Sequence, residues 1–133
     1  HKTLYNVHQR IARTYRVGRI VLTGDAAHIN NPLGGMGMNG GIHDSFNLAE
    51  KLIPVLKGKA DPAILDNYSD ARRNIAMQYV QKISIQNKND LEAKEPAEQL
   101  AFERRLIQAE HNLTKRRHLL LRLSMLASLG KTS

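Results

Sequence analysis

A glycine-rich loop between an apolar run and an amphipathic segment is the part of the sequence best suited to chemistry. The apolar run is Arg19–Thr23, and Gly24 and Asp25 follow it. Residues 26–41 contain five glycines, three asparagines and one proline, a composition that favours positive φ angles and close approach to a ligand. A strand that leads through such a loop into a helix leaves the first helical N–H groups unpaired. These groups attract an anion or an electron-rich ring edge.

Other common site motifs do not fit this sequence. The loop lacks the lysine and the Ser or Thr of a nucleotide-triphosphate loop, and its glycine spacing differs from that of the dinucleotide fingerprint. There is no glycine-serine-glycine nucleophile elbow. No metal site is predicted either, because no spacing joins two histidines and a carboxylate among His1, His8, His43, His111 and His118.

The order of residues in the loop resembles a known family, the class A FAD-dependent aromatic-ring monooxygenases of the para-hydroxybenzoate hydroxylase type. The second FAD motif of that family is an arginine-containing strand, Gly-Asp-Ala-Ala-His, prolines with paired glycines, and Gly-Met-Asn. This sequence has the same parts in the same order: Arg19, Gly-Asp-Ala-Ala-His at 24–28, Pro32, Gly34-Gly35 and Gly37-Met38-Asn39. The resemblance extends from Tyr5 to Leu56.

The resemblance implies that the chain contacts FAD. Asp25 would hydrogen-bond the ribityl chain through its carboxylate, Gly24 would let the backbone come near, and Arg19 would lie towards the diphosphate. Pro32 would lie near the reactive face of the flavin, and no catalytic residue is assigned. Taken alone, Asp25 is better explained as a turn former after a strand, and His28 is more often a loop or capping residue than a catalyst.

The start of the helix after the loop is the second expected contact. The resemblance implies that amides around Gly37, Met38 and Asn39 face the pyrimidine edge of the flavin, which agrees with the partial positive charge at a helix N-terminus. Met38, like the methionine two positions before it, is predicted to be a packing residue. Asp44 and Asn47 are predicted to complement the helix dipole and to cap neighbouring groups.

The resemblance also implies an activity for the intact enzyme. It would hydroxylate an aromatic, phenol-like substrate, with FAD as cofactor, O2 as co-substrate and NAD(P)H as transient reductant. An N-terminal βαβ unit with a glycine fingerprint would supply most adenosine and diphosphate contacts, and these residues contain no such unit. The chain, which begins at His1, is therefore expected to be a C-terminal fragment that lacks the N-terminal FAD-binding half and is inactive alone.

The elements that position the loop are predicted from hydrophobic periodicity. Near-alternation in residues 2–15 and the β-branched run 19–23 predict strands, the second one fully buried. Apolar residues at helical spacing predict a helix from about Met38 to Lys57, and a second helix opened by Asp61-Pro62 and ending near Lys94. One or two further amphipathic helices are predicted between Pro96 and Gly130.

These elements predict a mixed α and β fold that is mainly α in this fragment. It has one to three N-terminal strands, a glycine-rich loop and three to four helices, and it forms part of a larger α/β FAD-binding fold. Residues 1–57 are predicted to end a substrate sheet and to form the second half of an FAD-binding domain. Residues 58–133 are predicted to form a C-terminal helical region.

The net charge of +8 raises a different interpretation, in which residues 97–130 form a basic helical module that binds nucleic acid or a protein partner. Solvated helix faces explain such charge more simply. The segment also does not favour nucleic-acid binding, because Phe102 is its only aromatic residue and base stacking is not indicated. A homodimer formed through these helices is a further interpretation that the sequence allows. The basic residues concerned are Arg104, Arg105, Lys115, Arg116, Arg117 and Arg122.

The sequence contains no cysteine, which excludes a disulfide framework and fits a cytoplasmic protein. Its longest apolar run, Leu119–Leu129, is interrupted by Arg122. The run is also much shorter than the roughly 20 residues that cross a bilayer. No membrane partner is therefore predicted.

Overall fold

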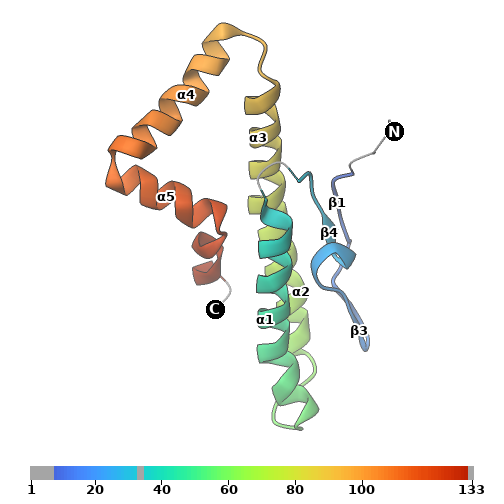
Figure 1. Ribbon diagram of the computed structural model, residues 1–133. Helices are drawn as coiled ribbons and strands as arrows, with labels where there is room; N and C mark the ends of the chain where they lie inside the picture. Colours follow the sequence, from blue (N-terminus) through green and yellow to red (C-terminus); the bar gives the residue numbers. More distant parts are fainter. Residues whose placement is uncertain (1–7, 33–34, 132–133) are drawn as a thin grey trace, which may run out of the picture.

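Helices dominate the computed structural model, which describes residues 8–32 and 35–131 (Figure 1). A small β region lies on one side of two long helical rods, and a helical hairpin lies on the other side. The predicted fold class, mainly α with strands at the N-terminal end, is confirmed. The part of the first predicted strand in residues 2–7, and Gly34 of the loop, lie outside the described residues.

The β region consists of four strands of two residues each: β1 (Arg10–Ile11), β2 (Arg16–Val17), β3 (Ile20–Val21) and β4 (His28–Ile29). β1 pairs with β4 and β2 pairs with β3, both antiparallel. The prediction of a fully buried strand over residues 19–23 was wrong. Only Ile20 and Val21 are strand residues, and Ile20 is 69% exposed because one face of the two-stranded hairpin has no covering layer among the described residues.

The first rod is α1 (Met36–Leu56), which begins close to the predicted start. Gly35 precedes it with φ 64°, a left-handed conformation that glycine adopts without the steric cost of a Cβ atom. Gly58 follows the helix in the same conformation, with φ 65°. The two glycines therefore account for the sharp start and end of the helix.

The second rod begins at Ile64, two residues later than Pro62, which was predicted to open it. The side chain of Asp61 still caps this region, because its Oδ1 atom accepts a hydrogen bond from the Ala63 amide at 2.7 Å. A six-residue π-helical segment interrupts the rod. The parts are α2 (Ile64–Ile75), the π-helical segment (Ala76–Gln81) and α3 (Lys82–Glu92).

The helical hairpin consists of α4 (Pro96–His111) and α5 (Leu113–Leu123), and a 3-10 helix (Leu126–Lys131) follows it. Pro96 occupies the start of α4, where a missing N–H costs nothing. Asn112 caps α5, since its Oδ1 atom accepts from the Lys115 amide at 3.0 Å. The helices predicted after Pro96 are confirmed. No helix in the described part of the chain has both the length and the apolar character that crossing a membrane requires.

The core consists of two small clusters on either side of α1 and α2. One cluster contains Tyr15, Ala27 and Tyr68 and joins the β region to α2. The other joins α1 and the second rod to the C-terminal segment, and its members are Met36, Ile75, Ile83 and Met125. The apolar stripe that predicted α1 faces solvent instead, and Phe46 is 69% exposed.

The buried face of α1 is largely small or polar: Met36, Gly40, Asp44 and Asn47. Asp44 was predicted to complement the dipole at the start of this helix, and that prediction was wrong. α1 begins at Met36, so Asp44 lies beyond its second turn, where it is fully buried against other elements. A charged residue at such a position requires partners, and the candidate site contains them.

Candidate functional site

The loop that carries the Gly-Asp pair packs directly on α1. Gly24–Ala26 forms one 3-10 turn, and Gly24 has φ 58°. A Cβ atom built on Gly41 of α1 would lie 3.4 Å from the Cα atom of Gly24, an ordinary van der Waals distance. The loop and the helix therefore pack against each other at these two glycines. Asp25 lies on the open side of this turn, and its side chain is exposed.

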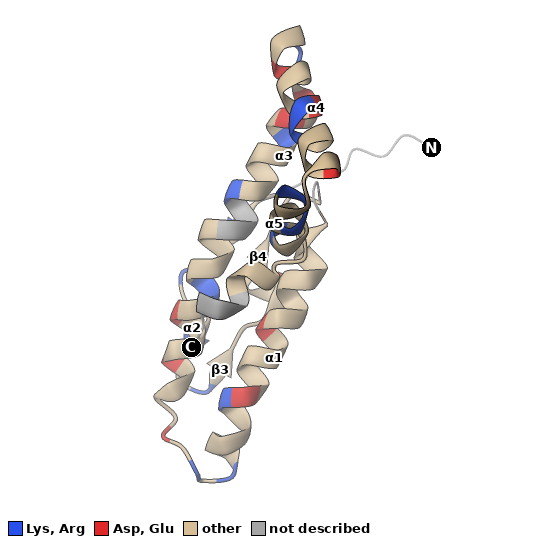
Figure 2. Ribbon diagram, turned by 90° about the vertical axis from the view of Figure 1, so that its left-hand side faces the viewer, with Lys and Arg blue, Asp and Glu red and all other residues tan. Residues whose placement is uncertain are grey.

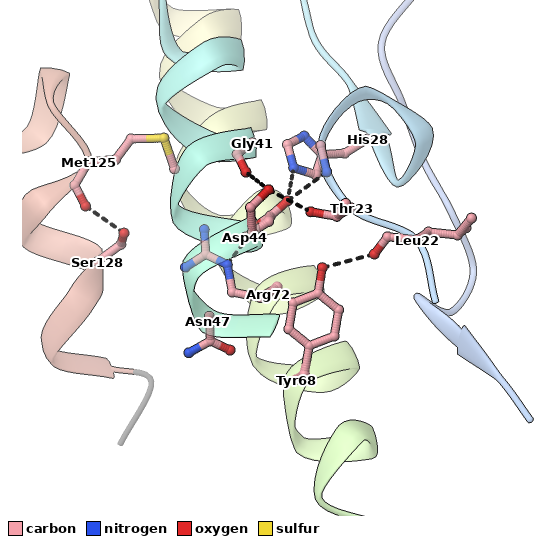
Figure 3. A network of polar contacts seen from close by, with 12 residues as sticks. Leu22, Thr23, His28, Gly41, Asp44, Asn47, Tyr68, Arg72, Met125 and Ser128 are labelled. Atoms are coloured by element: carbon pink, nitrogen blue, oxygen red, sulfur yellow. Dashed lines mark hydrogen bonds and ion pairs between the residues drawn. The ribbon is translucent and has the colours of Figure 1, made fainter. Parts of the chain in front are cut away.

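Asp44 is the hub of a buried polar network between this loop and α2 (Figure 3). Its Oδ1 atom accepts a hydrogen bond from Nε of Arg72 at 2.6 Å. Its Oδ2 atom lies 2.8 Å from Nε2 of His28 and accepts from the Gly24 amide at 3.2 Å. Exposed fractions are 0% for Asp44, 2% for Arg72 and 3% for His28. One carboxylate thus ties together the loop, α1 and α2.

The electrostatics of the network keep Asp44 ionised. Burial alone would raise the pKa of Asp44, but hydrogen bonds from His28 and Arg72 and the positive charge of Arg72 outweigh burial and lower it. Because Asp44 is an acceptor, the Nε2 atom of His28 carries the proton that lies between them. His28, which was expected to be an ordinary loop or capping residue, is instead a buried partner of this carboxylate.

Three buried polar atoms around the network have no hydrogen-bond partner within residues 8–32 and 35–131: Nδ1 of His28, Nη1 of Arg72 and the hydroxyl of Tyr15. The Tyr15 ring stacks on the His28 ring at a centroid distance of 6.1 Å. On the other side, Gly40 leaves little space, because a Cβ atom there would lie 3.3 Å from Cε1 of His28 and 3.6 Å from the sulfur of Met125. The network is therefore enclosed by a tyrosine and by the C-terminal segment.

Further hydrogen bonds attach the chain around the β2–β3 hairpin to α2. The Tyr68 hydroxyl donates to the carbonyl of Leu22 at 2.8 Å. The Tyr15 amide donates to Oγ of Ser69 at 3.0 Å. Burial raises the pKa of both tyrosines, so both hydroxyls stay protonated. Hydrogen bonds to α2 thus fix the position of the chain at Tyr15 and Leu22, ahead of Asp25.

The start of α1 is open, as the expected role of its amides requires. Gly37 and Met38 lie in the first turn, where N–H groups have no intrahelical partner, whereas Asn39 lies four residues after the N-cap Gly35 and is the first residue whose amide bonds within the helix. Met38 is 74% exposed, so the prediction that it packs in the core was wrong, whereas Met36 is fully buried as predicted. The side chain of Asn30 lies close to Gly37, because a Cβ atom at position 37 would lie 2.9 Å from Asn30 Oδ1 and would displace it.

A shallow groove of about 420 Å³ joins the Gly-Asp loop to this end of α1. Its lining is mostly apolar and small: Thr23, Gly24, Met38, Gly41, Ile42, Ser45 and Phe46. Of the seven predicted contact residues, only Gly24 and Met38 belong to this lining. Arg19 is exposed in the turn between β2 and β3, and Pro32 is exposed ahead of α1, where its carbonyl accepts from the Gly35 amide at 3.0 Å.

The described residues contain no group of three or more His, Cys, Asp or Glu side chains arranged to hold a metal ion. The chemistry of the site therefore rests on an exposed carboxylate, backbone amides and an apolar groove. Such a set offers hydrogen bonds to hydroxyl groups and to an electron-rich edge, beside a surface for a planar ring.

Comparison with known proteins gives this set of groups its context. A family model described as FAD binding domain matches residues 1–83, so the chain belongs to the FAD binding domain family. Para-nitrophenol 4-monooxygenase of a Pseudomonas strain is 42% identical over 100 residues, which are 75% of this chain and 25% of that protein. Pentachlorophenol 4-monooxygenase of Sphingobium chlorophenolicum is 44% identical over 79 residues, which are 59% of this chain and 15% of that protein.

Solved structures agree with this assignment. The p-nitrophenol 4-monooxygenase of Pseudomonas putida superimposes with a TM-score of 0.82 at 38% identity, over 90% of this chain and 31% of that chain. Anhydrotetracycline hydroxylase of Streptomyces rimosus gives a TM-score of 0.73 at 35% identity, over 89% of this chain and 24% of that one. The matched segments therefore cover between 15% and 31% of the length of these relatives.

Proposed function

We propose that this chain forms the flavin-contacting second half of the FAD site of an aromatic monooxygenase. The observation that carries the proposal is the junction at Gly24-Asp25, which presents an exposed carboxylate beside the open first turn of α1. The relatives described above supply the class of reaction, since they are monooxygenases of nitrophenol and pentachlorophenol. The additional length of those proteins is the source we propose for the remaining FAD contacts.

The residues present fit FAD in three respects. A carboxylate such as Asp25 accepts hydrogen bonds from sugar-like hydroxyl groups. The amides of Gly37, Met38 and Asn39 are donors at the positive end of a helix dipole, which suits the electron-rich edge of a flavin. The groove between them is lined by glycines, a serine and apolar side chains, which leaves a flat surface for a planar ring.

FAD, when bound, supplies the redox chemistry that inserts one atom of O2 into an aromatic ring, with NAD(P)H as the proposed reductant. The chain's own residues bind and orient. Asp25 accepts from the ribityl chain, Gly24 allows close backbone approach, and Arg19 lies towards the diphosphate. The α1 amides donate to the pyrimidine edge and stabilise negative charge there. Pro32 borders the reactive face, and no residue is assigned as a general base.

Several finer features belong to the same proposal. The substrate is a phenol-like aromatic ring, as in the nitrophenol and pentachlorophenol relatives. The protein is cytoplasmic, and a homodimer through the C-terminal helices is a proposed assembly. Residues 1–57 belong to the sheet end and FAD-binding domain, and residues 58–133 form the helical region.

A chimera tests the proposal. Residues 8–131 replace the matching segment of para-nitrophenol 4-monooxygenase, and the purified protein is analysed for bound FAD and for NAD(P)H oxidation in the presence of nitrophenol. We expect FAD to be retained and oxidation to occur. Asp25→Asn should weaken FAD binding by about tenfold, because a charge-assisted hydrogen bond is lost.

The matched control for the chimera is Asp66→Asn. Asp66 is an exposed carboxylate on α2 that pairs with Arg16 at 2.8 Å, and it has no proposed contact with FAD. FAD retention should be the same with and without this change. A folded chimera that retains no FAD, or one in which both substitutions weaken FAD binding equally, would contradict the proposal.

A further inference from the structure

The Gly-Asp loop is held in place by a buried charge, the carboxylate of Asp44. Asp25 faces solvent, and one residue before it the Gly24 amide donates to Oδ2 of Asp44 at 3.2 Å. Three residues after it, His28 donates to the same oxygen at 2.8 Å. Both ends of the short turn that carries Asp25 are thus bonded to one carboxylate oxygen of α1.

The other oxygen of this carboxylate is fixed independently. Nε of Arg72 donates to Oδ1 at 2.6 Å, and Arg72 comes from α2 rather than from the loop. Arg72 therefore sets the position of Asp44, while Asp44 sets the position of the turn. Figure 3 shows Arg72 on the α2 side of Asp44 and His28 on the loop side.

The negative charge of Asp44 is needed for the hydrogen bonds of the network and not for filling space. A neutral side chain of the same shape would fill the same space, yet it would offer one acceptor oxygen where the network uses two, each facing N–H donors. Gly40 and Gly41 agree with this arrangement, because a Cβ atom at Gly40 would lie 3.3 Å from Cε1 of His28, a tight contact, and one at Gly41 would lie 3.4 Å from the Cα atom of Gly24. Sequence and geometry both serve the approach of this turn to Asp44.

We propose that Asp44 is a positioning residue for FAD, which holds the Gly24–His28 turn so that Asp25 is presented in its binding conformation. Asp44 itself is buried and does not touch the cofactor. The inference rests on the proposed function and adds to it the residue through which the folded core determines FAD affinity.

The test uses Asp44→Asn in the 133-residue chain with two measurements. One is FAD affinity by titration of flavin fluorescence, and the other is hydrogen exchange at the Gly24 amide. We expect FAD affinity to fall by about tenfold or more, because a buried acceptor of charged and neutral donors is lost, and exchange at Gly24 to accelerate. Retention of wild-type affinity by a folded Asp44→Asn protein would overturn the inference.

A control of matched stability separates positioning from general destabilisation. Leu65→Ala removes a buried side chain of α2 that belongs to neither core cluster and, as a hydrocarbon, takes no part in the hydrogen bonds of the loop network. At a temperature where each variant is folded, Leu65→Ala should keep both FAD affinity and slow exchange at Gly24. An equal loss of affinity in Leu65→Ala would overturn the positioning role.

A second pair covers the case in which Asp44→Asn does not fold. His28→Gln keeps an N–H donor near the position of Nε2, whereas His28→Leu removes it, and both retain the Asp44–Arg72 pair. We expect FAD affinity to be kept by His28→Gln and lost by His28→Leu, and equal affinities would overturn the inference. If the wild-type 133-residue chain alone binds no measurable FAD, the same variants are compared in the chimera described above. A folded chimera with the unsubstituted segment that retains no FAD refutes the proposed function, which this design distinguishes from failure of the positioning role alone.

Discussion

The loop network around Asp44 and the C-terminal hairpin use charged residues in opposite ways. In the network, one aspartate, one arginine and one histidine are almost completely buried and bond to one another. In α4 and α5, basic and acidic side chains cover exposed surfaces, and Ala109 is the single buried residue that these two helices contribute within the described chain (Figure 2). The family model ends at residue 83, so it includes the network and excludes the hairpin.

This difference explains part of the positive charge that raised a nucleic-acid interpretation. Arg105 pairs with Asp90 of α3 at 2.6 Å, and Lys115 bonds to the Gln108 side chain at 2.6 Å. Arg116 donates to backbone carbonyls of α4, including that of Glu110. Lys115 and Arg116 thus hold the hairpin together, and Arg105 joins it to α3. The exposed charged side chains of α4 and α5 are solvated or bond to nearby groups. The buried charged side chains, in contrast, lie next to the proposed FAD site.

The largest expected contrast comes from breaking one arginine–aspartate pair in each region. Arg72→Leu should lower the free energy of unfolding by about 3–5 kcal/mol, because it leaves Asp44 buried without its cation. Arg105→Leu removes a pair at the same distance of 2.6 Å, but this arginine is exposed, so we expect a loss below about 1 kcal/mol. Urea denaturation measures both. Similar losses would show that burial does not separate the two regions.

Met125 is the point at which the two regions meet. It is buried, and it packs in the cluster with Met36, Ile75 and Ile83. Met125→Ala should cost about 2–5 kcal/mol and should make the hairpin more sensitive to proteolysis. Leu120→Ala, on an exposed face of α5, should change stability by less than about 0.5 kcal/mol. If Met125→Ala leaves proteolysis of α4 and α5 unchanged, the hairpin is attached by other contacts.

Two glycines with the same backbone conformation allow a smaller but more specific contrast. Gly24 has φ 58° in the loop, and Gly58 has φ 65° after α1. Alanine at either position should cost about 1–2 kcal/mol because of left-handed strain. Only Gly24→Ala should also weaken FAD binding, since Gly24 alone lies in the proposed site. Thermal unfolding and FAD titration of both variants measure this, and equal FAD affinities would place the loop backbone outside the site.

A change in acid sensitivity is the most gradual effect. The pKa of Asp44 is lower in the folded protein than its ordinary value of 3.8, so its ionisation stabilises the fold above that pH. This stability is lost as the pH falls below about 4 and through the lowered folded-state pKa. Unfolding free energies measured between neutral and acidic pH should therefore fall less steeply in Asp44→Asn than in the wild type. A parallel decline in both proteins would remove Asp44 as a source of acid sensitivity.

The sequence predicted the glycine loop, the helix that follows it and the family, because these depend on local residue types in a fixed order. It predicted the wrong face of α1. The apolar stripe that includes Ile42 and Phe46 is exposed in this chain, while the buried face carries Asp44. Hydrophobic periodicity predicts that a helix has an apolar face. It does not predict which element packs against that face.

The Asp44 network was not predicted, although one signal for it was present. Arg72 lies on the same helical stripe as Leu65, Tyr68 and Ile75, where a lone charge requires a buried partner of opposite sign. Asp44 lies on the stripe of Met36 and Gly40 in α1. Periodicity places each residue on its own helix face, but only the packing of α1 on α2 brings the two faces together.

The central claim is that the Gly-Asp loop and the first turn of α1 together contact FAD. The most direct test is a two-dimensional amide NMR titration of the 133-residue chain with FAD, which detects weak binding. The account predicts the largest shifts at Gly24, Asp25, Gly37, Met38 and Asn39, with α4 and α5 unchanged. The absence of any shift, or shifts confined to α4 and α5, would contradict it.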